Sequence, residues 1–365
     1  MINLFELKKQ NIHLKNSILK NIKKVLESGT YILGKEVKKL EFAFAKHCKS
    51  KHAVAVKNGT DALILSLKAF DIKPSDEVIT TSHTALATIA AIVSIGAKPV
   101  IVDIDKDYYT IDPIKLNFAI NKKTKAIIPV HIYGQPCDMQ AILKIGKKNN
   151  IAIIEDCSQA LGAKYKDKNV GTFGKIGTFS FYPTKNLGAI GDGGMLITNS
   201  ESIYKKLIKL RQYGWDNKRK TTFPGINSRL DEIQATILNI KLKKLDIENS
   251  KRIRISNIYK RKILNKNIIL PKTKKDSKHV FHIFAIMTKK RNQLIKHLKN
   301  KKIFTGIHYS EPACFSKGYR KFCKFNVKNL KNTIRVSKET LSIPIYPELS
   351  NYDINKIIKT INKFK

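Results

Sequence analysis

Cysteine and tryptophan are scarce in this sequence of 365 residues, which contains five cysteines and one tryptophan. The cysteines are scattered, odd in number and form no CxxC pair. We therefore expect neither a disulfide framework nor a bound metal ion. Long apolar runs are absent as well, and residues 1–10 lack the core of a signal peptide. These absences predict a cytoplasmic protein with no membrane partner.

Acidic residues are few: the chain has 28 of them against 70 lysines and arginines, giving a formal charge of +42. Such a charge can indicate nucleic-acid binding. However, the lysines are spread along the chain, and an AT-rich coding bias would also enrich lysine, asparagine and isoleucine. We therefore expect no nucleic-acid partner, since DNA binding would instead predict strongly salt-dependent affinity for duplexes. A positive field suits a small substrate that carries a diphosphate.

Short apolar runs alternate with helical patterns through the first half of the chain, which predicts an α/β fold with a mostly parallel sheet. In such sheets ligands bind beyond the carboxyl ends of the strands. The expected strands cover 53–56, 77–80, 99–102, 126–130, 151–154 and 177–181, and the helices between them cover 60–70, 85–95, 113–120 and 138–148. Five polar residues follow strand ends: Asn58, His83, Asp103, His131 and Asp156.

The length allows a large domain and a smaller one. Helices are expected at 15–27 and 35–48, before the first strand. A long helix at 229–245, capped by Ser228, closes the larger domain. A strand is expected at 280–287. We predict domains covering 1–245 and 246–365.

The stretch 151–198 contains an acid and a lysine that can serve one site. The strand 151–154 leads to Glu155 and Asp156, and the strand 177–181 leads to Lys185. Seven of the 18 glycines lie between 171 and 194, and glycine permits close approach of the backbone to a ligand. Asp156 can hold a cationic ring nitrogen, or it can be a cap or an ion-pair partner. A partly desolvated Lys185 can react with an aldehyde.

A phosphate site is suggested at residues 57–63, where Gly59 and Thr60 lie between a strand and a helix start. The free N–H groups and the helix dipole at such a place favour an anion. The same glycine can also simply make a tight turn. The later glycines at 191–194 lack both the Walker lysine and the Rossmann spacing, so we assign them to backbone packing.

Four motifs together resemble the DegT/DnrJ/EryC1/StrS family of sugar-nucleotide aminotransferases: NGTDAL, EDCSQALGA, GTFSFYPTKNLGAIGDGG and GINSRLDEIQA. The resemblance extends over about 31–245. It implies an aspartate-aminotransferase-like fold (fold type I) and the cofactor pyridoxal 5′-phosphate (PLP), which alternates with pyridoxamine 5′-phosphate.

The resemblance also implies the roles of individual residues. Lys185 matches the catalytic lysine that forms the internal aldimine and then moves the proton. A dehydratase branch of the family has histidine at this position, so Lys185 favours transamination. The other expected cofactor contacts are Asp156 at the pyridinium nitrogen, Gln159 near the 3′ oxygen, His83 stacked on the ring, Gly59, Thr60 and Ser180 at the phosphate, and Asn227, which is supplied by the partner of a homodimer.

Three further stretches, 81–88, 210–215 and 306–309, are similar to a subgroup that acts on dTDP-3-keto-6-deoxyhexoses. The resemblance to the family implies L-glutamate as the amino donor. The subgroup makes 3-amino-3,6-dideoxy sugars, which implies a role in surface polysaccharide such as the O-antigen of lipopolysaccharide. Tyr182, His308 and Tyr309 would contact the sugar, and Arg219 would meet the diphosphate. For His308 and Tyr309 the alternative is ordinary packing, and for Arg219 it is a solvated loop.

Two alternatives remain open on the sequence alone. One is the same chemistry on a 4-keto sugar nucleotide or a keto inositol. The other is a non-catalytic regulatory homologue, against which the intact set of Lys185, Asp156, Gln159, Ser180 and Asn227 argues.

Overall fold

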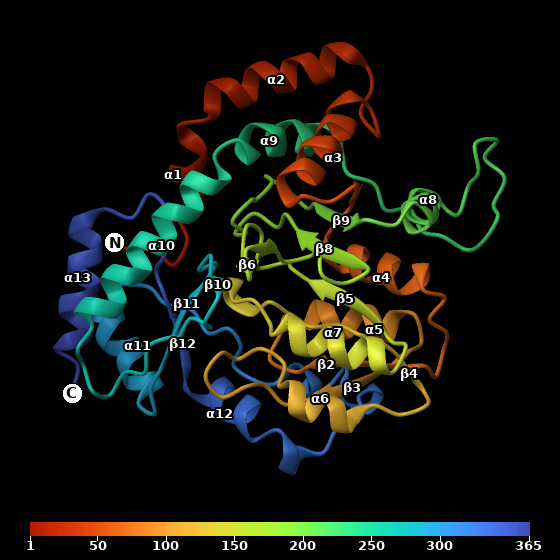
Figure 1. Cartoon of the computed structure of the whole chain (residues 1–365). Coiled ribbons are helices and arrows are strands. Elements are labelled where there is room, and N and C mark those ends of the chain that lie inside the picture. The colour runs from red at the N-terminus through yellow and green to blue at the C-terminus, as the bar shows by residue number, and fades with distance from the viewer.

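The structure, a computed structural model that describes residues 1–365, is built around a seven-stranded sheet (Figure 1). Neighbouring strands are parallel except around β9, which runs antiparallel to β1 and β8. The mostly parallel α/β sheet is therefore confirmed. In spatial order the strands are β1 His52–Val56, β9 Gly194–Thr198, β8 Ile176–Ser180, β5 Ala152–Asp156, β4 Thr124–Ile127, β2 Glu77–Thr81 and β3 Lys98–Val102.

Helices cover both faces of the sheet, which explains why its strands are almost continuously apolar. Ile79 and Ile153 pack on one face against α6 and α7, whereas Val78 and Ile154 pack on the other against α4 and α5. The helices of this region are α2 Lys15–Ser28, α3 Lys35–Cys48, α4 Gly59–Ala69, α5 Leu86–Ser94, α6 Pro113–Ala119, α7 Met139–Lys148, α8 Glu201–Leu210 and α9 Glu232–Leu242.

A second core gathers the C-terminal part of the chain around the pair β11 Phe284–Met287 and β12 Thr340–Ile343. Ile2 packs into this core, so both termini lie beside it in Figure 1. The predicted strand at 280–287 is present as its last four residues. The domain boundary near residue 246 stays a prediction. The helices here are α1 Leu7–Ile12, α10 Leu245–Lys262, α11 Arg291–Asn300, α12 Lys331–Glu339 and α13 Asn351–Asn362. A small separate sheet is formed by β6 Lys164–Tyr165, β7 Lys168–Asn169 and β10 Ser277–Lys278.

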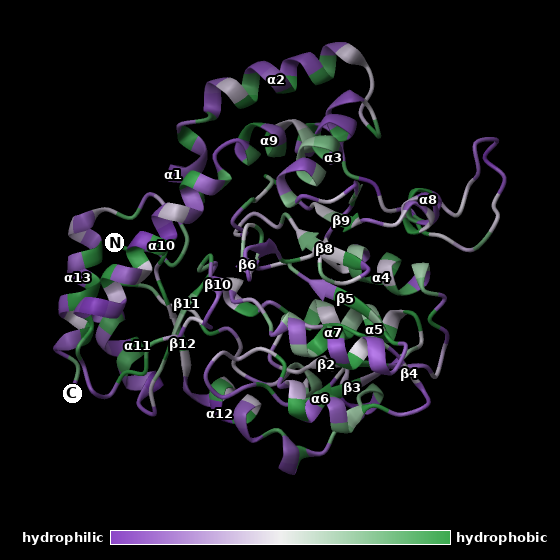
Figure 2. Cartoon of the chain, in the orientation of Figure 1, coloured by the Kyte–Doolittle hydropathy of each residue, from purple (hydrophilic) through white to green (hydrophobic).

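Several outer helices, among them α2, α10 and α13, carry many hydrophilic residues (Figure 2). No helix of the structure combines the length and the apolar character that crossing a bilayer requires.

The helix predicted at 229–245 is shorter, and Ser228 does not cap it. The helix α9 begins at Glu232 and ends at Leu242, and its N-cap residue, Asp231, makes no side-chain cap bond. Ser228 instead uses its hydroxyl oxygen to accept a hydrogen bond from the N–H of Lys57 (3.1 Å). A serine that caps a helix cannot be told from the sequence apart from a serine in a loop that accepts a hydrogen bond from an N–H remote in sequence. This accounts for the error.

The side chain of Glu232 caps a different helix, α3. Its carboxylate accepts hydrogen bonds from the N–H groups of Gly34, Glu36 and Val37 at 2.8–2.9 Å, and Glu232 is only 3% exposed. A negative charge at a helix N-terminus is favourable. One carboxylate thereby joins two helices that lie almost 200 residues apart in sequence.

We expect Glu232→Ala to lower the free energy of unfolding by about 3 kcal/mol, because three N–H groups, that of Val37 buried and those of Gly34 and Glu36 partly buried, lose a charged acceptor. Urea unfolding followed by circular dichroism, at fixed protein concentration, measures the change. The control is Glu27→Ala, which removes an exposed acid 3.8 Å from Lys23, and we expect it to cost less than about 0.5 kcal/mol. Equal effects of the two substitutions would contradict the capping role.

Candidate active site

The strand β5 ends with two acids that point to opposite faces of the sheet, as successive residues of a strand do. Asp156 is 4% exposed and is held at both carboxylate oxygens. Its Oδ2 accepts a hydrogen bond from Thr88 Oγ1 (2.9 Å), and its Oδ1 accepts one from the N–H of Ser158 (3.1 Å). The orientation of this carboxylate is therefore fixed before any ligand binds.

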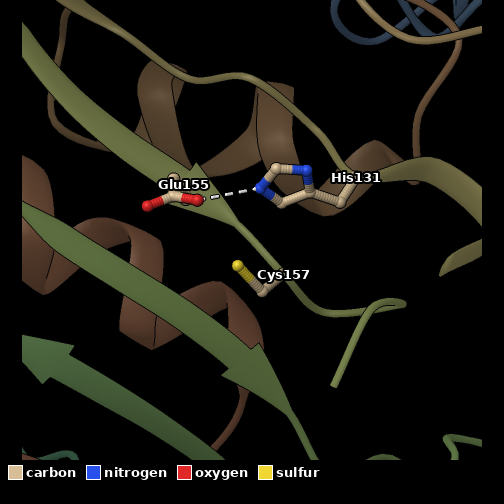
Figure 3. A group of neighbouring side chains, drawn as sticks. All are labelled: His131, Glu155 and Cys157. Atoms are coloured by element: carbon tan, nitrogen blue, oxygen red, sulfur yellow. Dashed lines mark hydrogen bonds and ion pairs between the residues drawn. The ribbon is translucent and has the colours of Figure 1, made fainter. Parts of the chain in front are cut away.

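Glu155, the other acid, lies in a buried cluster with His131 and Cys157 (Figure 3). Its carboxylate accepts from three N–H groups of the loop 171–174 at 2.7–2.8 Å. His131 Nδ1 accepts from the N–H of Cys137, so Nε2 carries the proton and donates it to Glu155 (3.1 Å). Burial raises the pKa of Cys157 to about 12, which keeps the thiol protonated. The cluster therefore anchors β5 to the loop 171–174 and to His131 through hydrogen bonds.

Lys185 lies in the loop after β8, close enough to Asp156 for the two charges to interact. Burial lowers the pKa of Lys185 to about 8, and the carboxylate of Asp156 acts in the opposite direction. The next residue, Asn186, is buried, and its Nδ2 donates to Asn249 Oδ1 (2.8 Å) in α10. The acid and the lysine expected to share a site are thus brought together, and α10 holds the lysine loop in place.

The start of α4 forms an anion cradle beside the end of β8. Asn58 caps the helix by accepting from the N–H of Asp61 (2.8 Å), while Gly59 and Thr60 occupy the first turn, where N–H groups have no intrahelical partner. A Cβ atom on Gly59 would lie 2.7 Å from Ser180 Cβ, so only glycine allows this approach. The three predicted phosphate contacts therefore converge on one helix N-terminus.

Residues predicted for cofactor and sugar meet around Tyr133. His83 Nε2 lies 2.6 Å from the hydroxyl of Tyr133. The backbone N–H of Tyr133 donates to Gln159 Oε1 (2.7 Å). Gln159 Nε2 donates to the hydroxyl of Tyr309 (3.0 Å), and the carbonyl oxygen of His308 accepts from the Tyr133 hydroxyl. The segment containing His308 and Tyr309 therefore lies against the predicted cofactor residues.

Three predicted residues do not join this network through their side chains. Tyr182 is 54% exposed. Arg219 lies in the loop that projects beyond α8 in Figure 1, and its guanidinium stacks on Trp215 at 5.8 Å. Asn227 is exposed at the base of that loop, where it forms a backbone bridge with Gln212. Their roles toward the sugar, the diphosphate and the phosphate of a second subunit remain predictions.

Sequence reasoning missed several residues that shape the site. Thr88 lies inside the stretch 81–88 that resembles the 3-keto subgroup, and Tyr133 lies two residues beyond His131. No spacing in the sequence indicates a role in the site for either residue. His282 comes from the C-terminal part: its Nδ1 lies 3.1 Å from Asn186 Oδ1, and its ring stacks on Phe5 at 6.4 Å. These contacts join segments that are remote in sequence, so no local pattern reveals them.

Asp103 also follows a strand end, but it has a structural role. Its carboxylate accepts from Lys115 Nζ (2.8 Å) and from the N–H and hydroxyl of Thr333 (2.8 and 2.7 Å). It therefore ties the C-terminal segment to the edge of the sheet.

The donor set fits PLP. A helix N-terminus with Ser180 suits its phosphate, and a fixed carboxylate, that of Asp156, suits its ring nitrogen. A lysine with lowered pKa suits its aldehyde. His83 is buried, and its Nδ1 has no hydrogen-bond partner within the chain. Such an orphaned atom indicates that another molecule completes this pocket.

A profile of the DegT/DnrJ/EryC1/StrS aminotransferase family matches residues 13–362. The chain belongs to this family. Over 364 residues it is 42% identical to the dTDP-3-amino-3,6-dideoxy-alpha-D-galactopyranose transaminase of Aneurinibacillus thermoaerophilus, covering 100% of this chain and 99% of the relative.

Two solved structures have closely similar folds. DesV of S. venezuelae, in complex with a ketimine intermediate, superimposes with a TM-score of 0.96 at 37% identity, covering 99% of this chain and 98% of that one. NtdA of Bacillus subtilis, with bound cofactor PMP, has a TM-score of 0.91 at 27% identity, covering 99% and 84%. The protein is thus a PLP-dependent sugar aminotransferase, and the regulatory alternative is set aside.

We expect the apoenzyme to react with added PLP at a rate that rises with pH around a midpoint near 8, the pKa of Lys185. Only the unprotonated amine attacks an aldehyde, so below the midpoint the rate falls about tenfold per pH unit. The measurement is the visible absorbance of the bound cofactor after mixing, and Lys185→Arg is the control without that absorbance. A midpoint near 10.5, the ordinary value for lysine, would contradict the desolvated environment.

Proposed function

We propose that the enzyme transfers the amino group of L-glutamate to the third carbon of a dTDP-3-keto-6-deoxyhexose. The product, a dTDP-3-amino-3,6-dideoxyhexose, would supply surface polysaccharide such as O-antigen. The observation that carries the proposal is the contact of Gln159 with Tyr309, together with that of Tyr133 with His308. These contacts bring the stretch typical of the 3-keto subgroup to the cofactor pocket. The product named for the Aneurinibacillus relative is of the same class.

The chain's residues divide the work between binding and proton transfer. When bound, PLP supplies an aldehyde that carries the amino group and a ring that accepts electrons. Asp156 holds a proton at the ring nitrogen, which its two fixed hydrogen bonds allow it to do without reorientation. Lys185 Nζ would move a proton between the substrate carbon and the exocyclic carbon of the cofactor, away from the carbon of the amino donor in one half-reaction and onto the carbon of the sugar in the other, because its pKa lies close to neutral pH.

The substrate is tested by offering dTDP-3-keto and dTDP-4-keto 6-deoxyhexoses with glutamate and identifying the aminated product by mass spectrometry and NMR. We expect amination at the third carbon only. Lys185→Ala, the control, should lower the rate by at least about 1,000-fold, since it removes the group that moves the proton. Amination only at the fourth carbon, or of a keto inositol, would overturn the substrate assignment and leave the family unaffected.

A homodimer with shared sites is part of the proposal. Large apolar side chains are exposed close to the lysine loop: Tyr31 is 49% exposed, Ile32 40% and Ile190 49%. Both segments border the first turn of α9: the N–H of Ile190 donates to Gln234 Oε1, and the N–H of Glu232 donates to the carbonyl oxygen of Tyr31. Exposed apolar clusters typically mark interfaces, and a second copy of this chain would cover this one.

The shared site is tested with hybrid dimers of Lys185→Ala and Asn227→Ala subunits, co-expressed with different tags. If Asn227 serves the partner's phosphate site, each parental variant is impaired, and the hybrid regains about half of the wild-type activity because one of its two sites is intact. An inactive hybrid, or full activity of Asn227→Ala alone, would contradict this role.

We also propose a cytoplasmic location, which is supported by the five free cysteines, four of them buried. The spread of lysines along the whole chain supports attraction of a nucleotide diphosphate rather than a nucleic-acid groove.

A further inference from the structure

Tyr133 occupies an unusual place between the cofactor residues and the sugar residues. It lies in the short 3-10 turn η1 Ile132–Gly134 that follows β4, with φ of 60°. A bulky side chain rarely adopts this left-handed conformation, which persists only when the surroundings hold it. Gln159 supplies part of that hold by accepting the N–H of Tyr133 at 2.7 Å.

The hydrogen bonds of the Tyr133 hydroxyl determine the protonation of His83. A phenol has one hydroxyl proton, and Tyr133 donates it in the hydrogen bond to the carbonyl oxygen of His308, which can only accept. The phenol oxygen must then accept from His83 Nε2 at 2.6 Å, so Nε2 carries the hydrogen. Burial lowers the pKa of His83 to about 3, so the imidazole is neutral and its Nδ1 is an unprotonated acceptor.

That acceptor has no partner within the protein although it is buried. Buried polar atoms are almost always paired, so a donor is expected to come from what binds in the pocket. The hydroxyl groups of a sugar are such donors.

We propose that Tyr133 is a positioning residue that fixes His83 as the Nε2–H tautomer, so that Nδ1 accepts a hydrogen bond from the bound sugar. The same phenol holds the backbone of His308, and with it Tyr309, against the pocket. The half-reaction with the keto sugar then depends on Tyr133 more strongly than the half-reaction with the amino donor, glutamate, does. That the hydrogen-bond donor to His83 Nδ1 is a sugar rests on the proposed function. The tautomer of His83 rests on the hydrogen bonds of Tyr133 alone.

The structure offers a matched control in Tyr109. Its ring packs edge-on against His83 and Tyr133 at 6.4 Å, in the same buried aromatic cluster. Its hydroxyl, however, donates to Met287 Sδ (2.9 Å) and touches neither His83 nor His308. Tyr109→Phe therefore removes a buried hydroxyl from the cluster without altering the proposed link.

The tautomer is tested by 15N NMR of the resting enzyme with labelled histidine, the His83 signals being assigned by their loss in His83→Phe. We expect Nε2 to be protonated and Nδ1 not in the wild type and in Tyr109→Phe, and a mixture of tautomers in Tyr133→Phe. A wild-type His83 protonated at Nδ1 would overturn the proposal. This measurement on the wild type needs no variant to fold and no substrate.

The kinetic test separates the two half-reactions in single turnovers. In Tyr133→Phe we expect the keto-sugar half-reaction to slow by about 10–100-fold, while bleaching by glutamate changes by less than about twofold. Equal slowing of both halves, or equal effects of Tyr109→Phe, would show a purely structural role. If the wild type aminates no 3-keto sugar, the proposed function fails, whereas the NMR result still decides the tautomer.

Discussion

The fixed carboxylate of Asp156 is the constraint on which the rest of the site depends. It is buried, and without a cation its charge would be costly in this position. Thr88 and Ser158 compensate part of this cost by donating to both oxygens. Lys185 faces it, and the low polarity that lowers the pKa of the lysine also strengthens the attraction between the two groups. A cofactor that is cationic at one end and reactive toward amines at the other completes this arrangement.

The strand β5 also stabilises the site through the side chain on its opposite face. Because side chains alternate along β5, Glu155 points away from Asp156 and binds the loop 171–174 and His131. Adjacent acids therefore have different tasks, one anchoring the strand and the other facing the reaction. The anchor is saturated with hydrogen bonds, as buried charges require.

The C-terminal part of the chain contributes contacts rather than cofactor ligands. Asn249 in α10 holds the lysine loop through Asn186, and Phe5 packs against both His282 and His308 at 6.4 Å. Tyr133 joins this part to the sheet through His308. The residues predicted to contact the second substrate consequently lie where two cores meet, as is common for ligand sites.

Much of this protein can be predicted from the sequence alone, because the relevant signals are local. Short apolar runs predicted six of the seven strands of the large sheet, all but β9, and most of the flanking helices, though not α8. The motifs around Gly59, Asp156 and Lys185 indicated the cofactor. Sequence does not reveal which polar residues past strand ends keep a polar atom without a partner in the chain: His83 Nδ1 has none, whereas Asp103 and His131 bind structural partners. Nor does it reveal that Ser228 serves Lys57 and not α9. Those choices depend on which distant donor or acceptor lies within hydrogen-bond reach, and only the packing of the whole chain decides that.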